Sequence, residues 1–246
     1  EELGLNEDLY PGAEVYGLLD LPKDTVPGTP IQQVVGLDDY IFDISITANR
    51  ADCQSVLGIA REVAAVLNKP LKMPATDYTV SDYKDQRLNI TVEAPDLCPR
   101  YLGHYVRNIT TGESPRWMRR QLALCGLRNI SNVVDITNYV MLEIGQPMHA
   151  YDYDEITGHT LTARLAKAGE NLHTLDDSSR LAKGTELVIA DAEHPAGLAG
   201  IMGGLETEVT EKTTTVVLEA ASFNGPSIRR TARACGLHSE ASGRFE

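Results

Sequence analysis

Three side chains between residues 131 and 152 could take part in a small polar pocket. They are the hydroxyl of Thr137, the carboxamide of Asn138 and the imidazole of His149. Together they offer hydrogen-bond donors and acceptors and a group that can exchange a proton near neutral pH. Each also has a structural interpretation: the first two could satisfy backbone groups at a helix end, and the histidine could be a structural hydrogen-bonding residue.

Two further stretches could supply an open backbone and a carboxylate to such a pocket. In the run LAGIMGG at 198–204, Gly203 and Gly204 leave no Cβ between backbone N–H groups and a ligand. Glu219 lies in the apolar run VVLEAASF at 216–223, which predicts a buried strand. A buried carboxylate is costly unless a hydrogen bond compensates it. The alternatives are a tight turn at the glycines and an edge strand on which the glutamate points to solvent.

A predicted helix and the turn after it determine where the first three side chains lie. Ser131 is a suitable N-cap, and Gly145 and Pro147 end the helix. At helical spacing, one face of this helix carries Val134, Thr137, Asn138 and Met141. Polar groups on a face otherwise fit for burial need partners. His149 follows in a short extended segment that can return past the same face.

The other elements indicate an α+β fold. Strands are predicted within 42–53, at 88–95 and 101–109, and then in quick succession at 161–166, 172–175, 186–191, 196–201 and 214–223. Helices are predicted at 56–67, from Ser114 and Pro115 to Gly126, and at 226–235, with another starting at Ser239. Because no βαβ alternation is present, we expect a β-rich α+β domain with a few helices, preceded by a small α/β segment.

One stretch is the best linker in the chain. Residues 70–87 are polar, low in aliphatic side chains and carry two prolines. A second domain should therefore begin near Leu88. Residues 1–42 are punctuated by prolines and predict short strands and loops at the edge of something larger.

The charge of the chain argues against a broad nucleic-acid surface. Its 22 basic and 35 acidic residues give a formal net charge of −13, the wrong sign for a surface that grips a phosphate backbone. Any RNA contact should therefore be local. The best candidate for such a local contact is a basic cluster formed by Arg116, Arg119, Arg120 and Arg128. The alternative is that these arginines form a solvated helix face.

Several other classes of function lack their motifs. The four cysteines form no CxxC pair and the histidines have no ligand-like spacing, so we expect buried reduced thiols and no metal site. No phosphate-binding loop or dinucleotide motif occurs. No stretch approaches the roughly 20 apolar residues of a membrane span, and no signal peptide is visible. A cytoplasmic protein is expected.

Seven phrases of the sequence resemble the beta subunit of bacterial phenylalanyl-tRNA synthetases. They are NRADCQSVLGIAREVAAVL (49–67), CPRYLGHYVRNI (98–109), NVVDITNYVMLEIGQPMHAYD (132–152), LVIAD (187–191), LAGIMGGLETEVTE (198–211), VVLEAASFN (216–224) and IRRTARACGLHSEASGRFE (228–246). The resemblance implies a central fragment of that subunit. It would comprise a partial accessory segment similar to the B1 domain at 1–87, the B3/B4 editing domain at 88–225 and the start of a B5-like domain at 226–246.

The resemblance also implies an activity and partners. The family's editing domain hydrolyses tyrosine wrongly attached to the phenylalanine tRNA, so tyrosine and the acceptor end of that tRNA are the expected ligands. The complete enzyme is a phenylalanine–tRNA ligase, a heterotetramer in which this subunit joins an alpha subunit that activates the amino acid. ATP and magnesium serve that complete enzyme, and no cofactor is expected in this portion.

Roles for single residues follow from the resemblance. Glu219 would read the para hydroxyl of tyrosine, and its burial would be compensated only when that hydroxyl arrives. Thr137 and Asn138 would hold the hydrolytic water, and His149 would orient it or bind the terminal ribose; whether His149 or a tRNA hydroxyl assists proton transfer stays open. The pocket walls would be Pro147, Met202, Gly203, Gly204 and Ala221. The competing interpretation is a scaffold that binds the alpha subunit or positions tRNA, with these polar groups satisfied internally.

Overall fold

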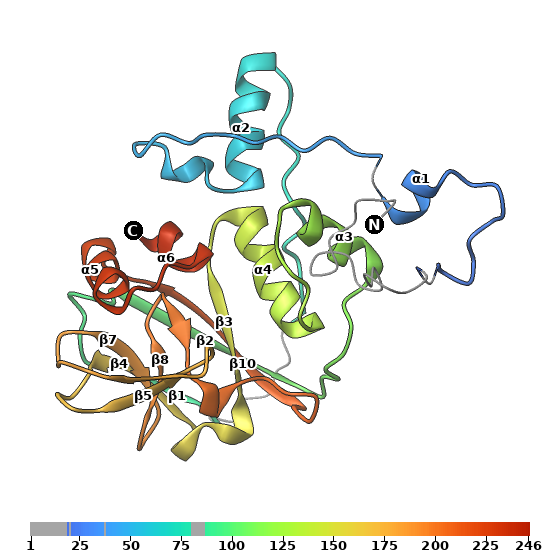
Figure 1. Ribbon diagram of the computed structural model, residues 1–246. Helices are drawn as coiled ribbons and strands as arrows, with labels where there is room; N and C mark the ends of the chain where they lie inside the picture. The colour runs from blue at the N-terminus through green and yellow to red at the C-terminus, as the bar shows by residue number, and fades with distance from the viewer. Residues whose placement is uncertain (1–18, 20, 37, 80–86) are drawn as a thin grey trace.

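The strands gather in the part of the chain that follows the linker (Figure 1). The structure is a computed structural model that describes residues 19, 21–36, 38–79 and 87–246. The described residues form a five-stranded sheet of order β1–β4–β7–β8–β9, with strands Asn89–Val92, Thr160–Leu165, Leu187–Ala190, Pro195–Leu198 and Met202–Gly203. A three-stranded sheet has the order β2–β10–β3, with strands Arg100–Arg107, Thr215–Ser222 and Met148–Asp152. A hairpin pairs β5 and β6, Asn171–Thr174 and Ser178–Leu181.

Helices α4, α5 and α6 lie beside these sheets, whereas α1 and α2 lie farther from them (Figure 1). The combination of sheets and separate helices confirms the α+β class. Their bounds are Ile31–Val35 (α1), Val56–Leu67 (α2), Arg116–Leu124 (α3), Asn132–Ile144 (α4), Gly225–Cys235 (α5) and Glu240–Phe245 (α6). Short 3-10 turns occupy Ala51–Cys53, Tyr153–Glu155, Thr157–His159 and Leu205–Thr207. None of the described helices combines the length and the apolar character that a membrane crossing requires.

Both sheets contribute side chains to one hydrophobic core. Tyr151 and Val217 of the three-stranded sheet belong to the same buried cluster as Leu161 of the five-stranded sheet. Ile228 and Ala232 of α5 are buried in this cluster as well. No break in packing therefore accompanies the domain boundary that the sequence predicts after residue 225, because the last helices cover the core of the preceding sheets.

Helix α4 begins and ends where its sequence predicts. The Ser131 hydroxyl accepts a hydrogen bond from the backbone N–H of Val134, and Gly145 ends the helix with a φ of 83°. In the first turn, Asp135 is almost fully buried and both of its oxygens have partners. Oδ2 accepts from the Ser114 hydroxyl at 2.6 Å, and Oδ1 accepts from the N–H of Ile130 at 2.9 Å. This carboxylate therefore ties both the residue before α3 and the connection between α3 and α4 to the first turn of α4.

Helix α3 starts differently from its prediction. The sequence predicts Ser114 as the N-cap and Pro115 as the first helical residue, but the helix starts at Arg116 and Pro115 takes the cap position. The Ser114 hydroxyl makes no cap hydrogen bond because it donates to Asp135 instead. A tertiary contact has therefore replaced the local one.

The strand predicted within 42–53 is wrong. Residues 42–46 form no regular structure, and the segment continues into a turn and the 3-10 turn Ala51–Cys53. An alternating pattern forms a strand only beside a partner, and no strand of the described chain pairs with this segment. Two of its apolar side chains stay exposed, Phe42 by 81% and Ile44 by 45%.

The rest of the N-terminal prediction is covered only in part. Residues 70–79 have no regular structure, in keeping with a linker, and 80–86 lie outside the described residues. Of residues 1–42, the described part contains the short helix α1 and no strand, and residues 1–18, 20 and 37 lie outside it. The predicted small α/β segment therefore shows helices only where it is described.

The cysteines differ from one another in burial. Cys53 and Cys98 are buried free thiols as expected, and Cys235 is half-buried. Cys125 is exposed, which contradicts the expectation of burial, because it follows the last residue of α3 at the helix C-cap instead of facing the core.

Replacing Asp135 by alanine should destabilise the fold. Asp135→Ala leaves a buried serine hydroxyl and a backbone N–H without their acceptors, so the free energy of unfolding should fall by about 2 kcal/mol or more. Denaturant titration measures this. The exposed Asp154 gives the control, since Asp154→Ala should change stability by less than about 0.5 kcal/mol. Equal stability of both variants would contradict the inferred role of Asp135.

Candidate functional site

The central strand of the three-stranded sheet holds Glu219 between two partners. Strand β10 pairs antiparallel with β2 and β3, and the register places Gly103 and His149 directly opposite Glu219. Side chains directly opposite each other in such a sheet share one face, and positions two residues away on the same strand share it too. Tyr101 on β2 and Tyr151 on β3 therefore lie on the same face as Glu219, diagonal to it on either side.

The Glu219 carboxylate is buried and held by two phenols. Its side chain is 7% exposed, and Oε2 accepts hydrogen bonds from the hydroxyl of Tyr101 at 2.6 Å and of Tyr151 at 2.5 Å. Burial raises the pKa of Glu219, and the two hydrogen bonds act against that rise. The expectation that a ligand alone would compensate this burial is thus wrong, because the protein itself satisfies one carboxylate oxygen.

The two tyrosines remain protonated donors. Burial, first, and the adjacent Glu219 charge, second, raise the pKa of both Tyr101 and Tyr151 well above the ordinary value of a phenol. Both hydroxyls therefore donate to the carboxylate at any pH at which the protein would work.

His149 is neutral at physiological pH and lacks a partner on one nitrogen. Burial lowers the pKa of His149 to about 4. Its Nε2 is enclosed and has no hydrogen-bond partner within the described part of the chain. The ring stands edge-on to that of Tyr151, with centroids 4.5 Å apart and an interplanar angle of 82°. An enclosed, unpaired imidazole nitrogen is costly in a folded protein, so it marks a place for a ligand or water to bind.

Gly203 packs directly against this imidazole. A Cβ at Gly203 would lie 2.4 Å from Cε1 and 2.5 Å from Nε2 of His149, closer than any real contact. Only glycine therefore lets β9 and β3 approach as they do, and Gly203 forms the wall beside the histidine.

These residues line one cavity of about 340 Å³, within the size range of small-ligand pockets. Six of the nine residues that the sequence points to are in its lining. They come from α4, the turn after it, β3, β9 and β10: Asn138, Pro147, His149, Met202, Gly203 and Glu219. Glu240 of α6 closes another side of the cavity.

Three predicted site residues do not line this cavity. The Thr137 hydroxyl donates to the carbonyl of Val134 at 2.7 Å. Successive helix residues point about 100° apart, so of Thr137 and Asn138 only Asn138 lines the cavity. Gly204 is buried, and its N–H donates to the carbonyl of Ala196 at 2.7 Å. Ala221 is buried in the core opposite Tyr101.

Sequence reasoning missed Tyr101 and Tyr151, which the structure brings to Glu219. A signal for them exists: Tyr151 follows His149 at strand spacing, and a carboxylate on a buried central strand needs donors from neighbouring strands. Tyr101 lies 118 positions from Glu219 along the chain, so only the strand pairing shows that it is a neighbour.

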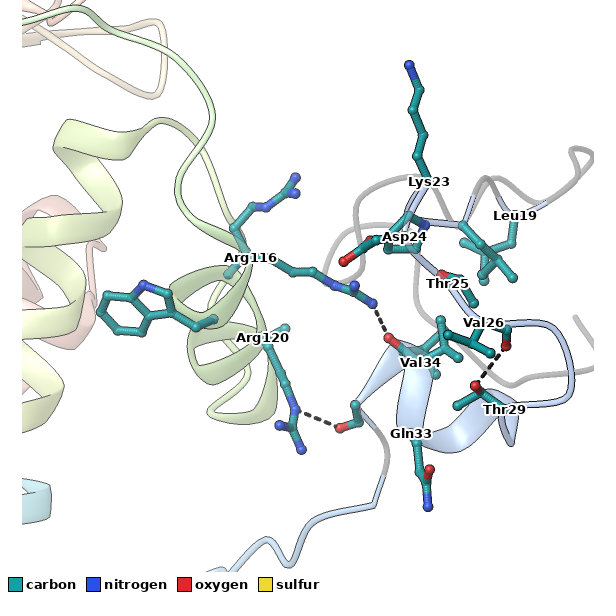
Figure 2. A pocket seen from close by; sticks show the side chains of 17 residues that line it. Leu19, Lys23, Asp24, Thr25, Val26, Thr29, Gln33, Val34, Arg116 and Arg120 are labelled. Atoms are coloured by element: carbon teal, nitrogen blue, oxygen red, sulfur yellow. Dashed lines mark hydrogen bonds between the residues drawn. The ribbon is translucent and has the colours of Figure 1, made fainter.

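A larger cavity of about 850 Å³ lies between the N-terminal segment and α3, shown in Figure 2. Arg116 donates to the carbonyl of Val34, and Arg120 Nε donates to the carbonyl of Gly36 at 3.0 Å. Two arginines of the predicted basic cluster thus cap the end of α1. The described residues that line this cavity include no histidine and a single carboxylate, Asp24, so the smaller cavity is the better candidate for chemistry.

One group of described residues has the spacing of metal ligands. Asp52, Cys53 and Glu62 bring their ligand atoms within 4.8 Å of one another. Both carboxylates, however, pair with Arg50, at 2.8 Å and 2.5 Å. The guanidinium of Arg50 therefore balances the negative charge of both carboxylates.

Comparison with known proteins identifies the family. The B3/4 domain matches residues 97–246, and the chain belongs to the family of proteins that contain this domain. The chain is 48% identical to the phenylalanine–tRNA ligase beta subunit of Moorella thermoacetica over 100% of its length and 31% of that protein. It is 45% identical to the subunit of the same name from Anaeromyxobacter dehalogenans, over 100% of this chain and 30% of that protein. The chain thus spans about a third of the length of these relatives.

A solved structure is also similar. An N-terminal fragment of the phenylalanyl-tRNA synthetase beta subunit from Pyrococcus horikoshii matches 78% of this chain and 58% of its own, at 15% identity and a TM-score of 0.45.

Adding one methyl group at Gly203 should displace His149. Gly203→Ala puts a Cβ into the imidazole edge, so the ring must leave its position and the protein should lose about 1–3 kcal/mol of stability. A crystal structure and a denaturant titration of the variant measure both effects. Gly112 has open space around it and gives the control, since Gly112→Ala should be close to neutral. An unmoved ring in Gly203→Ala would contradict the close approach.

His149 should make stability depend on pH below neutrality. The unfolded histidine binds a proton below about pH 6.5 whereas the folded one resists it until about pH 4, so stability is full above pH 6.5 and falls as the pH drops through this window. The loss attributable to His149 is about 3 kcal/mol. Unfolding free energies of wild type and His149→Gln between pH 7 and 4 measure it. Parallel profiles for the two proteins would refute the low pKa.

Proposed function

We propose that this chain is the editing module of a phenylalanine–tRNA ligase beta subunit, and that it hydrolyses the ester of tyrosine wrongly attached to the phenylalanine tRNA. One observation supports this most: a buried carboxylate, Glu219, lines the same cavity as the amide of Asn138 and the imidazole of His149. A carboxylate facing solvent or paired with an arginine would have favoured a scaffold without catalysis.

Recognition rests on the single difference between tyrosine and phenylalanine, the para hydroxyl. An apolar pocket barely rejects an added hydroxyl, whereas a pocket that hydrogen-bonds a hydroxyl can reject the analogue that lacks it by about 10⁴-fold. Glu219 supplies the acceptor for that hydroxyl, and its burial excludes water as a competitor. Met202, Gly203 and Pro147 provide the walls around the ring.

Hydrolysis requires a water placed beside the ester carbonyl. The water oxygen forms a bond to the carbonyl carbon, the bond from that carbon to the ribose oxygen breaks, and a water proton ends on the ribose oxygen. Asn138 and His149 are the groups that hold this water or the ribose. With a pKa of about 4, His149 is a weak base at pH 7 and serves best as a positioning hydrogen-bond partner. Thr137 has no direct part, because its hydroxyl is bound to the backbone of its own helix.

The partners follow from the same proposal. The chain carries a net charge of −13, so most of the affinity for tRNA comes from parts of the enzyme outside it, and only the acceptor end reaches the cavity. The parent protein works in the cytoplasm as a ligase with an alpha subunit, where ATP and magnesium serve amino-acid activation.

Removing the carboxylate should abolish editing and leave charging intact. In the two-subunit enzyme, Glu219→Ala should lower the rate of Tyr-tRNA deacylation at least about 100-fold while phenylalanine is still attached to tRNA. Glu219→Gln keeps an acceptor for the two tyrosines, and its melting temperature separates loss of recognition from loss of folding. The exposed Glu155 gives the matched control, Glu155→Ala. Undiminished deacylation in Glu219→Ala would refute the proposed function.

A further inference from the structure

We propose that Tyr101 and Tyr151 are positioning residues that set the specificity of this site. Their hydroxyls together occupy Oε2 of Glu219 and leave Oε1 as the acceptor for a para hydroxyl. This inference rests on the proposed function and adds to it. The Glu219 carboxylate accepts a hydrogen bond from the ligand's phenol on Oε1 because the hydroxyls of Tyr101 and Tyr151 already occupy Oε2.

Only one of the two oxygens of the Glu219 carboxylate has hydrogen-bond partners in the described part of the chain. Both hydroxyls bind the same oxygen, at 2.6 Å and 2.5 Å, and no hydrogen bond reaches Oε1 from the described part of the chain. A carboxylate oxygen offers about two lone-pair sites, so two donors saturate Oε2. Since Glu219 and Tyr151 both line the cavity, a ligand that enters it meets a carboxylate with one oxygen left to accept.

The sheet fixes this arrangement from both sides. Tyr101 comes from β2 and Tyr151 from β3, the two neighbours of β10, so the carboxylate is held between two strands that are themselves hydrogen-bonded to its own. Both tyrosines are buried, at 7% and 2% exposure. If either tyrosine hydroxyl were removed, the Glu219 carboxylate could turn, bind water on Oε2 or take up a proton. Each of these changes would weaken its preference for a donor at Oε1.

Few other titratable groups share this environment. Within the described chain, His149 stands opposite on β3 and Glu240 lies across the cavity on α6. Burial, first, and the nearby Glu219 charge, second, raise the pKa of the Cys98 thiol. None of these hydrogen-bonds to the Glu219 carboxylate, so the two phenols are the groups whose removal should change it.

The test compares two substrates in the complete two-subunit enzyme. Tyr101→Phe, Tyr151→Phe and the double variant each keep the ring and remove only the hydroxyl. For each single variant, the kcat/KM for Tyr-tRNA deacylation should fall about tenfold, mainly through a higher KM. The slow deacylation of Phe-tRNA, which has no para hydroxyl, should not change. Tyr105 lies on the same strand and face and packs its ring on Tyr153, so Tyr105→Phe is the matched control and should behave as wild type.

A titration of the carboxyl gives an independent readout. In ¹³C-carboxyl NMR of the chain, the pKa of Glu219 should be higher in Tyr101→Phe and Tyr151→Phe than in wild type, because a hydrogen bond that favours the charged form is lost. An unchanged titration, an unchanged preference for Tyr-tRNA over Phe-tRNA, or an equal loss on both substrates would overturn the positioning role. A wild-type enzyme that deacylates neither substrate would instead overturn the proposed function, and with it the role of the tyrosines in specificity.

Discussion

The candidate site depends on keeping an acidic side chain in the interior. Moving a carboxylate from water into an apolar surrounding costs several kcal/mol unless donors replace the lost hydration. Here the donors are two phenols that reach Glu219 from the strands on either side of it. The candidate site therefore depends on the register of the three-stranded sheet, since a slip of one residue would turn the carboxylate or its donors to the opposite face.

Around this centre, separate elements each contribute one surface of the cavity. Helix α4 brings the amide of Asn138, β3 brings the imidazole of His149, Gly203 of β9 supplies a thin wall, and α6 covers a further side. The two sheets share one core, and a second buried cluster joins Val133 of α4 to Ala150 and Val216 of the three-stranded sheet. Such a pre-formed site can discriminate ligands because its polar groups do not have to be ordered when the ligand binds.

Local signals in the sequence predicted the elements well and the contacts less well. The caps of α4, the glycine that ends it and the strand with Glu219 depend on near neighbours, and they are confirmed. The sequence pattern groups Thr137 with Asn138 because both fall on a broad helical face, yet only Asn138 of these two successive residues reaches the cavity. The tyrosine partners of Glu219 and the contact between Ser114 and Asp135 depend on chain segments that are distant in sequence, so no pattern within one element could predict them.

The contact between Gly203 and His149 also restricts how this sequence can vary. The imidazole fills the space that a side chain at position 203 would need. A lineage could exchange this glycine for a larger residue only together with a smaller one at position 149, and either change alone would pass through a less stable or inactive intermediate. Positions 149 and 203 are thus expected to vary together, because the short distance between β3 and β9 leaves room for only one large side chain.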